Sequence, residues 1–69
     1  MDVRRRLGLR IKQLRENAGL SQEELAHRSS IHVTYLSGLE NGKRNPSLLV
    51  LDRLAVALDL EMMSLFEHG

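Results

Sequence analysis

Apolar residues recur along this chain at intervals of three and four, the spacing that brings side chains onto one face of an α-helix. The residues that follow this spacing are Leu7, Ile11, Leu14, Leu36, Leu39, Leu51, Leu54, Ala55 and Leu58. The pattern predicts helices over residues 3–17, 22–29, 33–39, 48–58 and 61–67. The fold class is therefore predicted to be all-α, a compact five-helix bundle.

Residues that begin and end helices stand at the boundaries of these segments. Ser21 and Glu24 have the S-x-x-E spacing of a capping box, in which two side chains satisfy free amides at a helix start. Gly19 and Gly42 are suited to the left-handed conformation that ends a helix. Pro46 and Ser47 mark the exit from a loop and the cap of the next helix. Gly8, inside the first segment, is expected to weaken its first turns.

The stretch from Ser21 to Glu40 reads as two short helices joined by a tight turn, with Ile31 as an apolar plug in that turn. The second of these helices turns Leu36 and Leu39 inward. Its outer face carries Val33, Thr34, Ser37 and Gly38, with Tyr35 at the boundary. A helix with a small, uncharged outer face suits insertion into a groove of nucleic acid.

Length and charge sharpen this interpretation. The 69 residues make one domain, 1–69, which is too small for a large core and is therefore only marginally stable alone. Oligomerisation commonly stabilises domains of this size. Net charge is only +1, but it is unevenly distributed. Residues 1–45 carry nine Lys or Arg against five Asp or Glu, whereas residues 46–69 carry one against four. A basic part and an acidic part predict one face for phosphates and another for a different partner.

The sequence lacks the residue patterns that several classes of function require. There is no cysteine, and His27, His32 and His68 have no metal-binding spacing, so we expect no metal, cofactor, small-molecule ligand or catalytic residue. An enzyme is accordingly the weaker hypothesis. No signal-peptide pattern and no run of about 20 apolar residues occurs, which predicts a cytoplasmic protein without a membrane span.

The segments SQEELA and IHVTYLSGLENGKRNPSL resemble the Cro/repressor-type (XRE-like) helix-turn-helix family. The resemblance extends from Leu9 to Leu58 and implies a lambda-repressor-like DNA-binding domain that regulates transcription from a double-stranded operator. The short chain and the run TYLSGLENGKRNPS are similar to controllers of restriction–modification systems. Other small phage, plasmid or chromosomal regulators remain an alternative. The positions that carry the family pattern are Gln22, Ala26, Ile31, Leu36, Glu40, Gly42, Pro46 and Leu54.

The resemblance and the residue chemistry together define candidate DNA contacts. Gln22 is given a phosphate contact by the family pattern, and the cations Lys43 and Arg44 directly follow the predicted recognition helix. Val33 stands where the family often has an arginine, so a bidentate guanine contact is missing and a thymine methyl is the alternative target. The tyrosine either packs on the domain or contacts the DNA backbone. The full set is Ser21, Gln22, His32, Val33, Thr34, Tyr35, Ser37, Asn41, Lys43, Arg44, Asn45 and Ser47.

The resemblance further implies a structural ion pair between Arg15 of the first helix and Glu40 at the end of the third. If the pair is buried, removing one partner leaves the other charge desolvated.

The acidic C-terminal segment is the predicted dimer interface, with residues 59–69 contributing. It is rich in large apolar side chains that one domain cannot all bury, unless Leu65 and Phe66 alone plug the core. A homodimer demands a pseudo-palindromic operator. RNA polymerase is a further candidate partner, and an antitoxin-like protein-interaction module is the competing class. The predicted interface residues are Leu49, Val50, Met62, Met63, Leu65 and Phe66.

Overall fold

The computed structural model describes residues 2–66 and contains four α-helices and one short 3₁₀ helix. The elements are α1 (Val3–Asn17), α2 (Gln22–Ser29), α3 (Val33–Glu40), α4 (Leu48–Ala57) and η1 (Met62–Phe66). Within the described residues there is no β-strand, and no helix is both long and apolar enough to cross a membrane. The predicted all-α class is confirmed.

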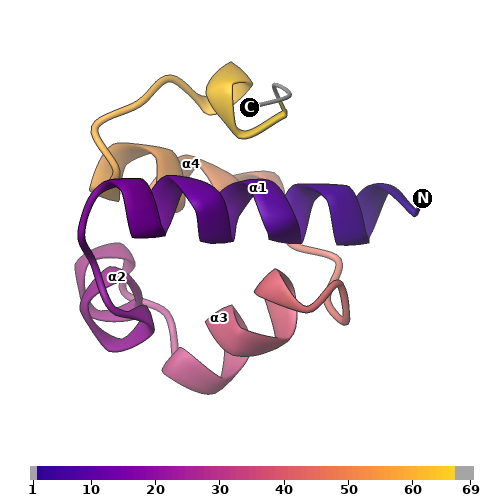
Figure 1. Cartoon of the computed structure of the whole chain (residues 1–69), viewed down its shortest axis with the longest axis horizontal. Coiled ribbons are helices and arrows are strands. Elements are labelled where there is room, and N and C mark those ends of the chain that lie inside the picture. Colours follow the sequence, from indigo (N-terminus) through magenta and orange to yellow (C-terminus); the bar gives the residue numbers. More distant parts are fainter. Residues whose placement is uncertain (1, 67–69) are drawn as a thin grey trace.

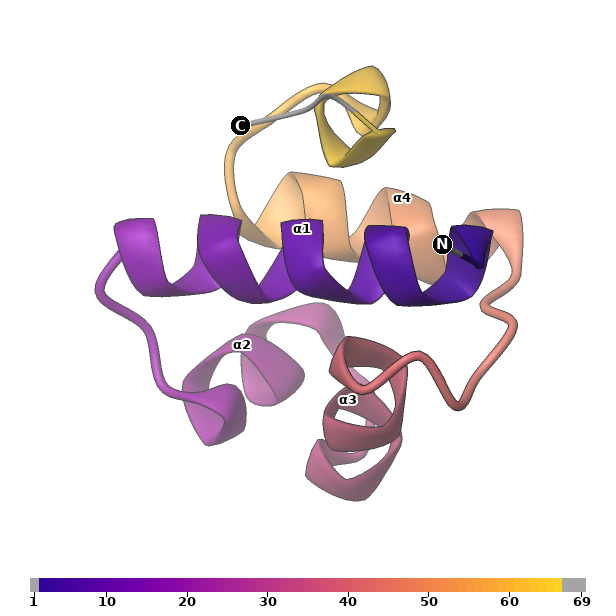
Figure 2. The ribbon, with the colours of Figure 1, turned by 45° about the vertical axis from the view of Figure 1, so that its right-hand side comes forward.

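The helices form three layers, and the long helix α1 lies in the middle one (Figure 1). Helices α1 and α4 occupy the middle, α2 and α3 lie on one side of them, and η1 lies on the other. A view turned by 45° keeps this order (Figure 2). Helix α1 packs against α3 and η1, while α4 packs against α2 and η1. The α2–α3 pair and the C-terminal η1 therefore face opposite sides of the domain.

The core is drawn from every element and consists mostly of leucine. Ile11, Leu25, Leu36, Leu39, Leu54 and Leu65 are its largest fully buried side chains. Burial of this kind is the main favourable contribution to folding. The remaining buried apolar residues are Leu7, Ala26, Leu51 and Ala55.

Side-chain caps begin three of the four α-helices. The Ser21 hydroxyl accepts from the Glu24 amide at 3.0 Å, and the Ser21 amide donates to the Glu24 carboxylate at 2.9 Å, so the predicted capping box is complete. The hydrogen bond from that amide lowers the pKa of Glu24. Ser47 caps α4 as expected, and Asp2 caps α1 with a 2.7 Å bond from the Arg4 amide.

The prediction of a fifth α-helix over 61–67 is wrong. Asp59 adopts a φ of 57°, which ends α4, and the chain then makes a 3₁₀ turn in which the Ser64 amide donates to the carbonyl of Glu61 at 2.9 Å. Five residues are too few for a stable α-helix, whereas 3₁₀ geometry is common in such short pieces. Residue 67 lies outside the described residues.

The role predicted for Gly8 also needs correction. Helix α1 is regular from Val3, and Gly8 is buried where α1 crosses the end of α3. A Cβ atom added at Gly8 would overlap the carbonyl oxygen of Leu39 and lie 2.8 Å from that of Glu40. The glycine therefore allows two helix backbones to approach closely, and the helix propensity it lacks is secondary.

Two helical glycines provide a matched test of this contact. Gly8→Ala should lower the free energy of unfolding by about 1–3 kcal/mol, because backbone carbonyls cannot move aside. Gly38→Ala should raise it by about 0.5–1 kcal/mol through helix propensity, since the added methyl meets only the flexible Arg44 side chain. Urea denaturation of the two variants measures both changes. Equal effects would show that Gly8 is not a packing requirement.

Candidate nucleic-acid interface

Helices α2 and α3 are joined by the three residues Ser30, Ile31 and His32. Ser30 has a φ of 59°, a conformation more usual for glycine, and it ends α2. Ile31 is half-buried against the core, as predicted for the plug of the turn. His32 caps α3 by its backbone geometry, without a side-chain hydrogen bond. The turn thus sets α3 at a fixed angle to α2.

Helix α3 is held to the domain by one face and by its carboxyl end. Leu36 and Leu39 are buried, whereas Val33 and Thr34 are exposed and Ser37 is half-exposed. In Figure 2 the end of α3 lies close to α1, and its first turn projects away from the domain. Val33 and Thr34 are therefore on the projecting turn, and Ser37 follows on the same face one turn later.

The loop after α3 carries exposed cations in a defined place. Gly42 has a φ of 74°, and the Lys43 amide donates to the carbonyl of Gly38 at 2.9 Å, which closes the end of the helix. The Arg44 guanidinium lies 5.5 Å from the centre of the Tyr35 ring, within the range of a cation–π contact. Helix α3 and the loop that follows it therefore form one continuous surface.

This arrangement bears on the two roles considered for Tyr35, packing on the domain and contact with the DNA backbone. Its ring is half-buried and packs against the hydrophobic core, while Arg44 covers part of its outer face. Gly38 leaves room for Arg44, whose Cγ and Nε atoms would lie 3.2 Å from an added Cβ. The tyrosine ring thus supports the arginine in addition to packing on the domain.

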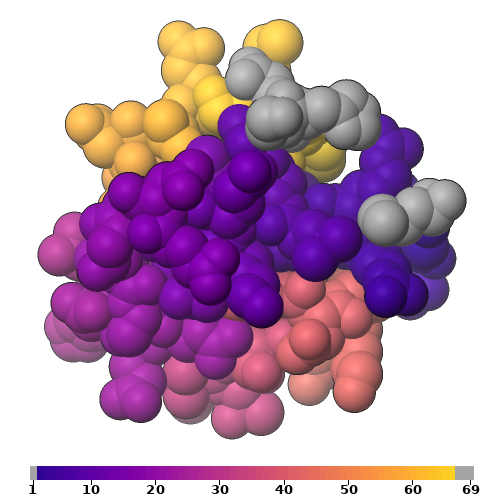
Figure 3. All heavy atoms as spheres, viewed as in Figure 1, coloured from indigo at the N-terminus to yellow at the C-terminus, as the bar shows by residue number. Residues whose placement is uncertain are grey.

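One cation that the sequence analysis did not assign joins this surface. A Cβ atom at Gly42 would lie 3.0 Å from the Cα atom of Arg5, so the loop lies directly against the start of α1. The space-filling view shows the indigo start of α1 beside the salmon-coloured loop (Figure 3). Arg5 is exposed, whereas its neighbour Arg4 is paired with Asp2. The close approach at Gly42, which no sequence pattern reveals, distinguishes Arg5 from Arg4 and Arg6, its neighbours in the sequence.

None of the twelve residues predicted to contact DNA is buried. Three of them also have structural hydrogen bonds: Ser21 and Ser47 cap helices, and the Asn41 amide donates to the carbonyl of Ser37 at 2.8 Å. These three residues shape the ends of α2, α3 and α4, and each of them is exposed.

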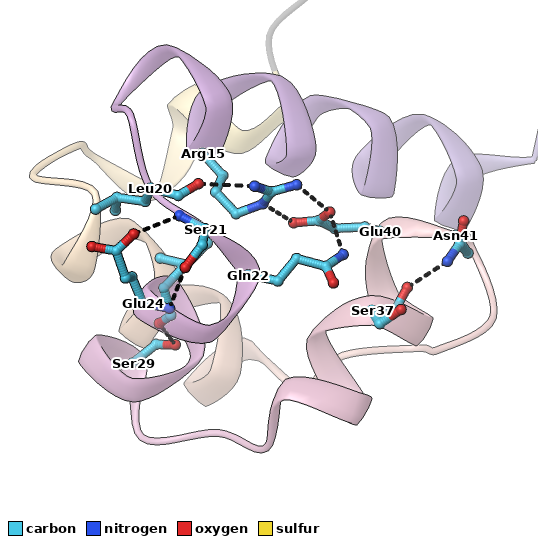
Figure 4. A network of polar contacts seen from close by, with 10 residues as sticks. Arg15, Leu20, Ser21, Gln22, Glu24, Ser29, Ser37, Glu40 and Asn41 are labelled. Atoms are coloured by element: carbon cyan, nitrogen blue, oxygen red, sulfur yellow. Dashed lines mark hydrogen bonds and ion pairs between the residues drawn. The ribbon is translucent and has the colours of Figure 1, made fainter.

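A buried network links this surface to α1 (Figure 4). Arg15 donates from Nε to Glu40 Oε2 at 2.7 Å and from a second nitrogen to Oε1 at 3.1 Å, so the expected ion pair is formed. Arg15 also donates to the carbonyl of Leu20 at 2.8 Å. The hydrogen bonds to Glu40 raise the pKa of Arg15. The third donor to Glu40 is the side-chain amide of Gln22, at 3.0 Å.

The residues predicted for a dimer interface differ in what they expose. Met63 is 76% exposed and Phe66 52%, and Leu49 is also exposed, while Met62 and Val50 are partly buried. The prediction for Leu65 is wrong, because its side chain is fully buried in the core. The 3₁₀ turn points Leu65 inward and leaves Phe66 outside. Residues 67–69, the end of the predicted segment 59–69, lie outside the described residues.

The groups gathered on the α2–α3 side are amides, hydroxyls and guanidinium or ammonium cations. They are donors suited to phosphate oxygens and base edges. Across residues 2–66, no three His, Cys, Asp or Glu side chains come together in a way that would hold a metal ion. The surface therefore offers hydrogen-bond donors and positive charge to a partner.

Two short helices joined by a tight turn, with the second helix projecting, define a helix-turn-helix protein. Residues 11–65 match the model of the Helix-turn-helix family, and the chain belongs to that family. This confirms the resemblance found in the sequence.

Individual relatives are transcription regulators. The chain is 43% identical over 65 residues to the uncharacterized HTH-type transcriptional regulator y4dJ of Sinorhizobium fredii, covering 94% of this chain and 84% of the relative. Among solved structures, the restriction–modification controller protein C.AhdI from Aeromonas hydrophila has 45% identity and a TM-score of 0.89, covering 90% of this chain and 94% of that one. SinR, a master regulator for biofilm formation solved in complex with DNA, has 37% identity and a TM-score of 0.82, covering 88% and 98%.

The ion pair is testable by a double-mutant cycle. Glu40→Ala should lower the free energy of unfolding by about 3–5 kcal/mol, because it leaves the Arg15 charge buried without a partner. The same change should cost much less in an Arg15→Ala background, since the two residues share one desolvated site. Denaturation of the four proteins gives the coupling, and strictly additive losses would show that the pair contributes no specific interaction.

Proposed function

We propose that this protein is a sequence-specific regulator of transcription that binds double-stranded DNA as a homodimer on a pseudo-palindromic operator. The observation that carries the proposal is the projecting first turn of α3 beside the exposed cations Lys43 and Arg44. Helix-turn-helix proteins place the second helix in the major groove, with its first residues at base edges. That SinR was solved in complex with DNA supports the same use of the shared fold. Such a regulator acts in the cytoplasm, where the chromosome lies.

The surface divides into positioning and reading groups. Arg5, Gln22, Lys43 and Asn45 are suited to phosphates, which fix the register of the protein on the duplex. Val33, Thr34 and Ser37 face the base edges, where Val33 meets a thymine methyl. Arg44, held by Tyr35, stands between the two groups and reaches either the backbone or a base. The remaining candidates complete the rim of the contact.

Within the family, we propose a controller of a restriction–modification system. The support is the 45% identity to C.AhdI, extended over nearly the full length of both chains. A controller of this kind would regulate the endonuclease gene and its own gene. As an activator it would also contact RNA polymerase. An adjacent methyltransferase and endonuclease gene pair would support this assignment, and a lone gene in a prophage or plasmid would favour the alternative of a phage- or plasmid-type repressor.

Dimerisation through the C-terminal side is compatible with DNA on the α3 side. Figure 1 places η1 and α3 on opposite sides of the α1–α4 layer, so a partner covering η1 leaves the recognition surface free. Met63 and Phe66 expose large apolar areas there. The segment after Pro46 is also acidic, so two copies of the basic surface need not approach each other.

The contact assigned to Arg44 is testable through salt dependence. Arg44→Ala should weaken binding to a DNA fragment selected by the wild-type protein from a random-sequence library. A lost phosphate contact should reduce the slope of log K against log salt by about 0.9. If Arg44 reads a base, the slope should change less and discrimination at one base pair should fall by about 1–3 kcal/mol. Fluorescence anisotropy at several salt concentrations measures both.

The matched control is Arg53→Ala, which removes an exposed arginine from α4. Arg53 lies beside Asp52 and lines a hollow with Arg28 and Val56, to which Arg44 does not contribute. Equal losses for both variants would mean that only net charge matters, and the assignment of Arg44 to the interface would be withdrawn.

The dimer is testable by charge insertion. Met63→Lys should produce monomers with an unchanged helical spectrum and weak DNA binding, because a buried unpaired ammonium disrupts an apolar interface. Val56→Lys is the control, since Val56 is 70% exposed on α4 and is not assigned to the interface. Sedimentation of the wild type and both variants measures the oligomeric state. If Met63→Lys remains dimeric, the interface lies elsewhere on the domain. A monomeric wild type at high micromolar concentration would rule out the dimer.

A further inference from the structure

The carboxylate of Glu40 receives three hydrogen bonds from two different residues (Figure 4). Arg15 occupies Oε2 at 2.7 Å and shares Oε1, at 3.1 Å, with the side-chain nitrogen of Gln22 at 3.0 Å. Glu40 is only 4% exposed, whereas Gln22 is half-exposed. A buried ion pair is therefore connected directly to a side chain on the surface.

The chemistry of this contact fixes the orientation of the Gln22 amide. An ionised carboxylate can only accept hydrogen bonds, so it admits the NH₂ end of the amide and rejects the carbonyl end. The Gln22 oxygen must therefore face away from Glu40. Without this constraint, an exposed glutamine amide would sample both orientations and several rotamers.

The orientation of the Gln22 amide matters for phosphate binding because of where Gln22 lies. Gln22 is the first residue of α2, where the first turn of the helix has backbone N–H groups without helical partners. Such a helix start is a favourable place for a phosphate oxygen. One N–H of the Gln22 amide is used by Glu40, and the direction of the second N–H is fixed as a consequence.

We propose that Glu40 is a positioning residue for DNA binding, which acts by orienting the amide of Gln22 for its contact with the duplex. The buried pair thus has a second role besides stabilising the fold: Arg15 holds Glu40, and Glu40 holds Gln22. The inference rests on the proposed DNA-binding function, because Gln22 must contact DNA for its orientation to affect affinity.

The direction of the expected change in DNA affinity distinguishes this positioning role from a long-range effect of charge. Glu40→Gln removes a negative charge, which on long-range grounds alone should strengthen binding to DNA. The new amide also presents donors as well as an acceptor, so it no longer imposes one orientation on Gln22. Positioning therefore predicts weaker binding, although the protein has become more positive.

The test is a cycle of Glu40→Gln and Gln22→Ala in affinity for a DNA fragment selected by the wild-type protein from a random-sequence library. Each single variant should bind about three- to tenfold more weakly, the usual net effect of one hydrogen bond. The double variant should bind no more weakly than Gln22→Ala alone. The measurement is made at a temperature where circular dichroism shows all four proteins folded. Tighter binding by Glu40→Gln, or the same loss in both backgrounds, would overturn the proposal.

Glu24→Gln is the matched control. It removes the same charge as Glu40→Gln, but from α2, two residues after Gln22, and glutamine preserves the capping box with Ser21. Its affinity for the same fragment should be unchanged or higher. A loss equal to that of Glu40→Gln would mean that removal of any nearby carboxylate weakens binding, and the specific role of Glu40 would be lost.

A measurement without DNA keeps the inference separate from the proposed function. In the wild-type protein, one side-chain N–H of Gln22 should exchange slowly with solvent and resonate downfield by nuclear magnetic resonance, because it donates to a carboxylate. Gln13 is the reference, since it is exposed on α1 and its amide oxygen accepts from Arg10. If the Gln22 amide behaves like that of Gln13, the orientation by Glu40 is refuted. If the Gln22 amide is protected but the protein selects no DNA, the proposed function fails instead.

Discussion

The ion pair between Arg15 and Glu40 is the interaction on which the placement of α3 depends. Glu40 is the last residue of α3, and Gly8 lets the same end of that helix rest directly on the backbone of α1. The carboxyl end is therefore fixed by a charge and by a steric fit, and the first turn is left to project. Because every buried side-chain nitrogen and oxygen within residues 2–66 has a partner, the desolvation of this pair is compensated.

A core this small limits what else the domain can stabilise. The buried residues are short aliphatic chains, and the single Phe of the sequence, Phe66, remains half outside. Domains of this size bury a modest fraction of their surface and have little stability to spare. Loss of a capping bond, of one partner of the ion pair or of the close contact at Gly8 would thus be large relative to the net free energy of unfolding. The exposed apolar residues Leu48, Leu49 and Met63 are surface that a single copy leaves uncovered.

The sequence predicted the features that depend on local chemistry. The four α-helices were placed within two residues at each end, because Ser21, Ser47, Gly19 and Gly42 act on the backbone beside them. Features that depend on distant neighbours were missed or misjudged. Gly8 reads as a weak helix former until α3 is seen against it, and Leu65 was distinguished from Phe66 only by the 3₁₀ turn. The hydrogen bond from Gln22 to Glu40 joins residues 18 apart, and periodicity carries no information on such contacts.

The composition of α3 explains why recognition by one copy of the proposed regulator would be modest. Val33, Thr34 and Ser37 offer two methyl-bearing side chains and two hydroxyls, without the arginine that forms the commonest guanine contact. Each wrong base pair then costs at most about 1–3 kcal/mol, and only over a few positions. Two-fold pairing doubles those positions and adds the sequence-dependent cost of shaping the DNA between the half-sites. Weak reading by each α3 and an uncovered apolar surface on the opposite side would therefore be two consequences of one small domain, and in the proposed dimer a second copy would compensate for both.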